Sequence, residues 1–213
     1  MKKIIIKPGE IKTMFLDTIK NVEINLGEYS ILTIVTILEK GWEETRKMTF
    51  NLTEEYAILN LIGIIVGQKN NKFDFEITAS HTAPNTIFSS DFRSILLDQS
   101  EINAQGRLII EQTADNTESF LNHHSMNFSE TAKFQTIPSL EIKTNNVKAG
   151  HSVTIGKIDN NQILYMKSRG LNEKTTKKLL IESFLKTDLD KVKDKKTKQF
   201  VINKLDRLKL GKC

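Results

Sequence analysis

The sequence has only one cysteine among its 213 residues, Cys213, at the C-terminal end. A single thiol cannot form a disulfide within the chain, so a disulfide-stabilised fold is excluded. Such cysteine usage is typical of proteins from a reducing cytoplasm. No pair of cysteines has the spacing of a structural zinc site, so we expect no zinc-stabilised fold.

Long hydrophobic runs are also missing. Residues 1–6 contain three consecutive isoleucines before Lys7 and Pro8, which is too short for the core of a signal peptide. The most apolar window, residues 57–67, is interrupted by Asn60 and is too short to span a bilayer. The sequence also has no glycine-rich phosphate-binding motif. We therefore expect a cytoplasmic protein that neither enters a membrane nor binds a nucleotide itself.

Aromatic residues make up only 7% of the chain, so the core must consist mainly of Ile, Leu and Val. This β-branched composition favours many short strands. Apolar and polar residues alternate over 22–26, 48–52 and 73–77, and residues 30–38 are apolar enough to be buried on both faces. Such segments recur roughly every twenty residues, which suits a solenoid of stacked strands. A β-sandwich is the competing prediction.

The hydrophobic period changes to that of a helix after Gly170. Leu171, Leu179, Leu180, Phe184 and Leu185 are available for one apolar stripe. Asn172 is a suitable N-cap for this helix, and a second helix is expected to begin at Thr187. The sequence therefore predicts a β region over residues 1–170 and a helical region over residues 171–213.

The helical region is basic, with nine Lys and one Arg against four Asp over residues 186–212. Such a segment is found in proteins that bind nucleic acid or anionic surfaces. However, it has almost no aromatic residues on which bases could stack. A solvated, lysine-covered helix is the favoured interpretation, and we expect no nucleic-acid partner.

Residues 138–184 contain an ordered series of short motifs: P-S-L-E-I at 138–142, N-N-V-K-A-G-H at 145–151, Y-M-K-S-R-G at 165–170 and I-E-S-F at 181–184. In this order and at these spacings they resemble the C-terminal part of the SufB/SufD family, the scaffold of the Suf iron–sulfur cluster assembly machinery. The resemblance implies a mainly β protein with a right-handed parallel β-helix core followed by a small C-terminal helical region. It further implies a scaffold subunit that is not an enzyme.

The resemblance also implies partners and a site. The partners are the Suf ABC-type ATPase and either a SufB-like subunit or a second copy of this chain. His151 matches the histidine that faces the partner subunit on the SufD side of the family, which implies a role in cluster assembly with the imidazole as a metal ligand. The predicted docking surface for the ATPase comprises Tyr165, Ser168, Arg169, Gly170, Glu182 and Phe184. The alternative is that Tyr165 and Phe184 only pack the helix onto the last coil.

The sequence departs from the family beside His151. Many members carry a cysteine shortly before this histidine, where this chain has Lys148, Ala149 and Gly150. Clusters are held chiefly by thiolates. We therefore expect a transient iron–sulfur cluster shared with a partner subunit, and none bound by this chain alone. This absence places the chain closer to the SufD side.

The remaining histidines predict no metal site. His123 and His124 are adjacent, so in a strand their side chains point to opposite faces. His81 precedes a turn at Pro84 and is expected at a strand end. A β-helical enzyme acting on carbohydrate or acyl groups is an alternative function, but it needs a cluster of carboxylates or histidines that the sequence does not show.

Overall fold

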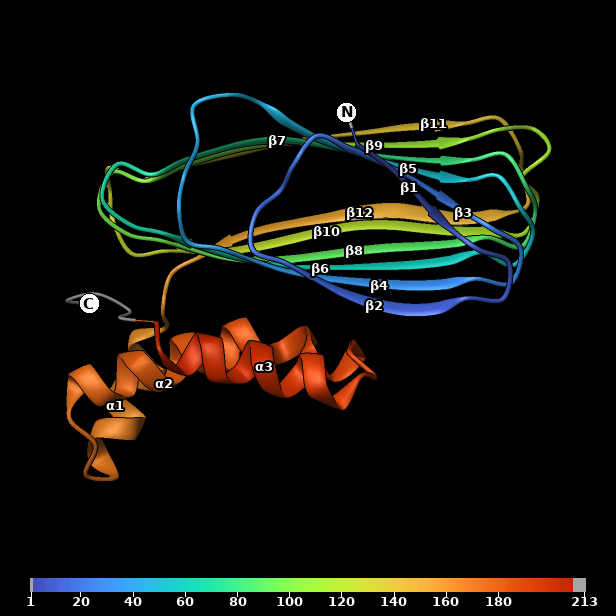
Figure 1. Ribbon diagram of the computed structural model, residues 1–213. Coiled ribbons are helices and arrows are strands. Elements are labelled where there is room, and N and C mark those ends of the chain that lie inside the picture. The colour runs from blue at the N-terminus through green and yellow to red at the C-terminus, as the bar shows by residue number, and fades with distance from the viewer. Residues whose placement is uncertain (1, 209–213) are drawn as a thin grey trace.

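Two six-stranded parallel sheets account for most of the molecule in the computed structural model, which describes residues 2–208 (Figure 1). Sheet A contains, in spatial order, β1 (Lys2–Ile6), β3 (Val22–Leu26), β5 (Arg46–Leu52), β7 (Lys72–His81), β9 (Glu101–Ile110) and β11 (Lys133–Ile142). Sheet B contains β2 (Ile11–Leu16), β4 (Ile31–Leu38), β6 (Ile58–Gly67), β8 (Ile87–Leu96), β10 (Thr117–Asn127) and β12 (Val147–Gly156).

The chain alternates between the sheets, so each coil contributes one strand to each. Strand β7, for example, pairs in parallel with β5 and β9, and β8 pairs with β6 and β10. This pairing confirms the predicted parallel β-helix, and the β-sandwich alternative is wrong because its sheets would be antiparallel.

The main core fills the space between the two sheets. Its largest fully buried side chains include Phe50, Phe73, Phe75 and Phe88, surrounded by Ile and Leu from both sheets. Gly63 allows a close approach inside this core, since a Cβ atom there would lie 2.1 Å from the ring of Phe92. Several of the scarce aromatic residues are therefore used to fill the space between the sheets.

Four helical segments follow the strands: α1 (Asn160–Ser168), α2 (Glu173–Lys186), the 3-10 turn η1 (Thr187–Lys191) and α3 (Lys195–Asp206). Helices α2 and α3 and the turn η1 cover the outer face of sheet B, whereas α1 has no buried residue and lies against α2. A second apolar cluster joins Val35, Ile37, Ile62 and Ile64 of the sheet to helical residues such as Ile181 and Leu185. The predicted burial of residues 30–38 on both faces is therefore confirmed. Among the described residues, no helix is long and apolar enough to cross a membrane.

A network of ion pairs connects η1, in the helical region, to β8. The Nε of Arg93 lies 2.5 Å from Asp188, and Lys191 bridges Asp188 at 3.2 Å and Asp91 at 2.8 Å. Burial opposes ionisation of Asp188, but the two cations outweigh it and hold the pKa of this carboxyl below its usual value. The side chains of Arg93 and Asp188 are only 16% and 12% exposed, so solvent screens this pair weakly.

The strand-to-helix transition comes earlier than the sequence predicted. Helix α1 precedes Gly170, which has φ +91° and ends this helix, so the prediction that Gly170 releases a strand into a helix is wrong. The Asp159 side chain accepts a hydrogen bond from the Asn161 N–H and starts α1. None of the α1 residues is buried. A search for an apolar stripe therefore could not detect it.

The helices after Gly170 agree better with the prediction made from the sequence. Asn172 caps α2 as predicted, because its Oδ1 accepts from the Thr175 N–H at 2.8 Å. Thr187 begins η1 and not a longer helix, and α3 starts later, after Asp194, which caps it through the Thr197 N–H. Leu179 is exposed and does not belong to the buried stripe, which Ile181 and Leu185 form instead.

Candidate functional site at the terminal coil

The terminal coil consists of β11 and β12, each of which has a strand neighbour on one side only. Strand β11 pairs with β9 and β12 pairs with β10, so both sheets end here with an open edge. Open edges present unpaired backbone N–H and C=O groups, which can pair with another chain. Figure 1 shows these two strands at the same end of the β-helix.

Apolar side chains are exposed along the same coil. Ile137 and Ile142 of β11 are 52% and 43% exposed, and Val153 and Ile155 of β12 are 38% and 59% exposed. Ile142, Val153 and Ile155 are in register with buried residues of the preceding coil, so in an inner coil the next pair of strands would cover them, whereas Ile137 points outward. The open end therefore combines unpaired backbone with an apolar surface.

His151 lies in the middle of β12 and is exposed. It is in register with Leu121 of β10, a residue of the main core, so both side chains are on the inward-facing side of sheet B. Within residues 2–208, its ring takes part in no hydrogen bond or ion pair. Gly150 and Ser152 on either side add little bulk, which leaves the imidazole accessible.

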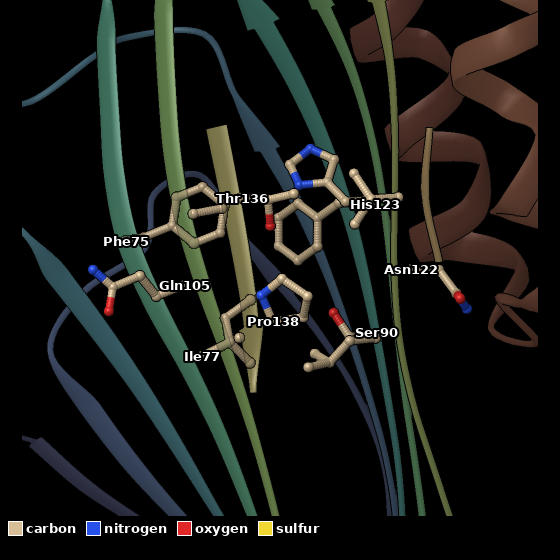
Figure 2. A pocket seen from close by; sticks show the side chains of 13 residues that line it. Phe75, Ile77, Ser90, Gln105, Asn122, His123, Thr136 and Pro138 are labelled. Carbon is tan, nitrogen blue, oxygen red and sulfur yellow. The ribbon is translucent and has the colours of Figure 1, made fainter. Parts of the chain in front are cut away.

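A small cavity lies beneath the terminal coil, between the two sheets. It has a volume of about 30 Å³, enough for a water molecule, and Val153, Pro138 and Leu121 contribute to its wall. Figure 2 shows Ser90, Thr136, Pro138 and His123 around this space. The interior is therefore incompletely filled at this end of the β-helix.

The ring of His123 belongs to this interior. It is in register with Val153, is 6% exposed, and packs against Phe92 and edge-on against Phe134. Its Nε2 lies 3.2 Å from the Ser94 hydroxyl. Burial, with a smaller contribution from His124, lowers the pKa of His123 to about 3, so the ring is neutral at physiological pH.

The other two histidines have structural partners. His81 ends β7 as predicted, is fully buried, and contacts the hydroxyls of Thr86 and Ser119 at 2.7 and 3.0 Å. Burial lowers its pKa to about 4. His124 points outward, opposite to His123, and contacts Thr154 at 2.7 Å. The prediction that His123 and His124 occupy opposite faces is confirmed.

Four residues predicted for the docking surface lie together at the C-terminal end of α1. Tyr165 is 58% exposed, and the Arg169 guanidinium lies 5.3 Å from its ring centroid. The Ser168 hydroxyl donates to the Tyr165 carbonyl at 2.7 Å, and Gly170 follows. Tyr165 and Met166 also line a pocket of about 320 Å³ between α1 and Leu180 of α2.

The other two predicted residues lie further along, on α2. Glu182 is half-buried between Lys178 and Lys186, at 3.6 and 3.9 Å. Phe184 packs against the apolar cluster on sheet B and lies beneath the Arg93 guanidinium, 5.0 Å away. These contacts give Phe184 the packing role that the sequence left as an alternative.

Several features were not found from the sequence. The burial of His123 was not predicted because its ring is covered by Phe92 of β8 and Phe134 of β11, which belong to different coils. The Arg93–Asp188 pair was not predicted because it joins residues 95 positions apart. Within residues 2–208, no group of three or more His, Cys, Asp or Glu side chains could hold a metal ion. Cys213 lies outside the described residues.

Comparison with known proteins gives a consistent family assignment. Residues 17–184 match the family described as "SUF system FeS cluster assembly, SufBD core domain". The chain is 25% identical over 154 residues to the iron-sulfur cluster assembly protein SufD of Escherichia coli, covering 72% of this chain and 36% of that protein. It is 26% identical over 171 residues to a SufBD family protein of Synechocystis, covering 80% and 35%. A SufBD family protein of Mycobacterium bovis is 30% identical over 168 residues, covering 75% and 42%. The chain thus spans less than half the length of these relatives.

Proposed function

This chain belongs to the SufBD core family of iron–sulfur cluster assembly proteins, and on that basis we propose that it is a scaffold subunit which pairs through its terminal coil. The partner is a SufB-like subunit or a second copy of the chain. In this role the chain positions other components and catalyses no reaction itself.

The open edges of β11 and β12 carry the proposal. A second chain with similar edges can continue both sheets, because main-chain hydrogen bonds need no particular side chain. It would also cover the inward-facing side chains of Ile142, Val153 and Ile155. Both ends carry lysines on their edge strands, Lys2, Lys3 and Lys12 on β1 and β2 and Lys133 and Lys148 on β11 and β12, so edge lysines do not distinguish the two ends.

Pairing through this coil would bring His151 to the junction between the subunits. A neutral imidazole can ligate iron, although clusters are held mainly by thiolates. The described residues offer one imidazole here and no thiol, so the nascent cluster would take its remaining ligands from the partner subunit. The cluster is then a product held briefly between two chains.

Docking of the Suf ATPase on the helical region is the second element of the proposal. Helix α1 has no buried residue, and its Leu164 and Tyr165 are 67% and 58% exposed beside the pocket that Tyr165 lines. Exposed aromatic anchors next to a pocket are typical of protein–protein interfaces. Tyr165, Ser168, Arg169 and Gly170 thus form the expected centre of this surface, with Glu182 and Phe184 supporting α2 behind it.

The pairing is tested with Ile155→Lys on β12, measured by sedimentation of the chain alone and with a SufB-like subunit. A buried lysine at the junction should weaken association at least about tenfold, since an unpaired charge is costly to desolvate. The matched control is Ile5→Lys on β1, where the side chain is 71% exposed at the opposite end. This variant should pair normally. Loss of pairing in Ile5→Lys with normal pairing in Ile155→Lys would contradict the proposal.

A further inference from the structure

Six turns carry the chain from sheet A to sheet B, and the first five each contain one residue in the left-handed conformation. Gly9, Tyr29, Tyr56, Asn85 and Asn116 have φ between 54° and 69° and follow one another along the stack. Backbone hydrogen bonds join the turns, from the Gly9 N–H to Glu28 and from the Tyr29 N–H to Glu55. We call this column of five residues the turn ladder.

Two of these positions hold residues that are unfavourable there. Asn tolerates the left-handed region, and in the ladder the Asn116 amide donates to the Asn85 side chain at 2.7 Å. A bulky aromatic residue at positive φ is a conformational outlier, and such strain is retained mainly where a function needs the side chain. Tyr29 and Tyr56 are successive outliers of this kind. Asn at these two positions would continue the amide ladder without strain.

The two tyrosine rings form a flat, accessible surface. They are parallel, with centroids 4.8 Å apart and planes at 6°, and they are 57% and 42% exposed. The next ladder position beyond Tyr29 is Gly9, where a Cβ would meet no atom within 4 Å. No side chain at that position therefore covers the Tyr29 ring, and a planar group can stack there.

The electrostatic surroundings select the charge of that group. Burial raises the pKa of the Tyr29 hydroxyl, and Tyr56, Glu28 and Glu55 raise it further. None of the ion pairs among residues 2–208 involves Glu28 or Glu55, whereas Glu10, Glu23 and Glu76 each hold a lysine. Negative charge beside an aromatic face disfavours phosphorylated ligands and favours a cation.

From this geometry we infer that the turn ladder at Tyr29 and Tyr56 is a docking site for an arginine side chain of a partner protein. A guanidinium is planar, stacks on aromatic faces and pairs with carboxylates, and it is more weakly hydrated than an ammonium group. Stacking over Gly9 would place it on Tyr29 with Glu28 and Glu55 nearby. The inference does not depend on the proposed pairing. The ladder lies in the turns between the two sheets, and none of its residues belongs to the terminal coil of β11 and β12.

The test uses a tri-arginine peptide with blocked ends and the whole chain labelled at its tyrosine rings for NMR. The sequence has three tyrosines, so Tyr165 on α1 serves as an internal control. We expect saturable shifts of the Tyr29 and Tyr56 signals, with Tyr165 unchanged. A tri-lysine peptide should bind roughly two- to fivefold more weakly, since it lacks the stacking contribution.

The double variant Tyr29→Asn, Tyr56→Asn separates docking from folding. Asn suits the left-handed turn, so the melting temperature should stay constant or rise while tri-arginine binding is lost. Tyr29→Phe keeps the ring and should keep the binding. Equal binding of the lysine and arginine peptides would overturn the inference, as would shifts caused by a short single-stranded oligonucleotide but not by the peptide. A large fall in melting temperature for the Asn variant would also overturn it, because the tyrosines would then be structural.

Discussion

The four histidines differ mainly in what surrounds each ring. His81 and His123 are buried among hydroxyls and aromatic rings, His124 contacts Thr154 on the outer face, and His151 is exposed on the terminal coil. Burial removes water from the first two rings and makes their charged forms unfavourable. These two histidines therefore affect the pH dependence of stability, while His151 is available for function.

Acidification should destabilise the protein through the buried histidines. Their pKa values in the folded chain, about 4 for His81 and about 3 for His123, are below the ordinary value near 6.5. The unfolded chain therefore binds more protons below pH 6.5. The free energy of unfolding should fall from pH 6.5 to 5 by roughly 1 kcal/mol per pH unit for each ring. Urea unfolding at several pH values measures this slope.

The variant His123→Phe should show a smaller slope over the same range, because one of the two most deeply buried rings is gone. Above about pH 8 both rings are neutral in either state, so their contribution should be constant there. An unchanged slope in His123→Phe would show that this ring does not titrate on unfolding as the burial implies.

His151→Ala tests the proposed ligand directly. If His151 ligates the nascent cluster, cluster formation followed by visible absorption should decrease severalfold, while gel filtration shows an intact complex. The control His124→Ala removes an imidazole from the outer face of the neighbouring strand and should form clusters normally. Normal rate and yield of clusters in His151→Ala would assign this residue a structural role.

At the scale of secondary-structure elements, partly buried ion pairs between β8 and η1 connect the β-helix to its helical region. Asp188→Asn removes the anion from the Arg93–Asp188 pair and leaves a poorly solvated cation. Breaking a pair buried to this degree should lower the free energy of unfolding by about 2–4 kcal/mol. Glu173→Gln disrupts an exposed pair with Lys177 and should leave the free energy of unfolding nearly unchanged. Similar small effects of both variants would show that the apolar cluster alone holds the helices.

Helix α1 differs from α2 and α3 because it contributes nothing to that cluster. Tyr165→Ser should therefore leave the melting temperature nearly unchanged while weakening ATPase association about tenfold or more in a pull-down titration. Phe200→Ser on α3 removes another aromatic ring, 52% exposed, and is the matched control. ATPase association that is weakened by Phe200→Ser but not by Tyr165→Ser would move the docking surface to α3.

At the scale of the whole molecule, the β-helix has an end coil with open edge strands at each end. Coils in a solenoid are stabilised by their neighbours, so an end coil is the first to open. In the free chain, outward-facing amides of β11 and β12 should exchange hydrogen rapidly. Pairing with a SufB-like subunit should slow this exchange at least about tenfold, without changing that of β4 and β6. If the partner instead slowed hydrogen exchange at the amides of β1 and β2, the proposed pairing would be contradicted.

Much of the architecture was determined by the sequence alone. Alternation in residues such as Val22, Ile24 and Leu26 specified strands, because side chains in a strand point to opposite faces. The ordered motifs from Pro138 to Phe184 indicated the family and with it the β-helix. The N-cap at Asn172 was also local information, since its hydrogen bond spans only three residues.

The tertiary structure decided what depends on contacts between coils. Helix α1 has no apolar stripe because it packs on no core, so its sequence gave no periodic signal. The burial of His123, the Arg93–Asp188 pair and the stack of Tyr29 on Tyr56 all join residues that are adjacent only after coiling. The sequence determined the faces of the strands, and the register between coils determined which side chains meet.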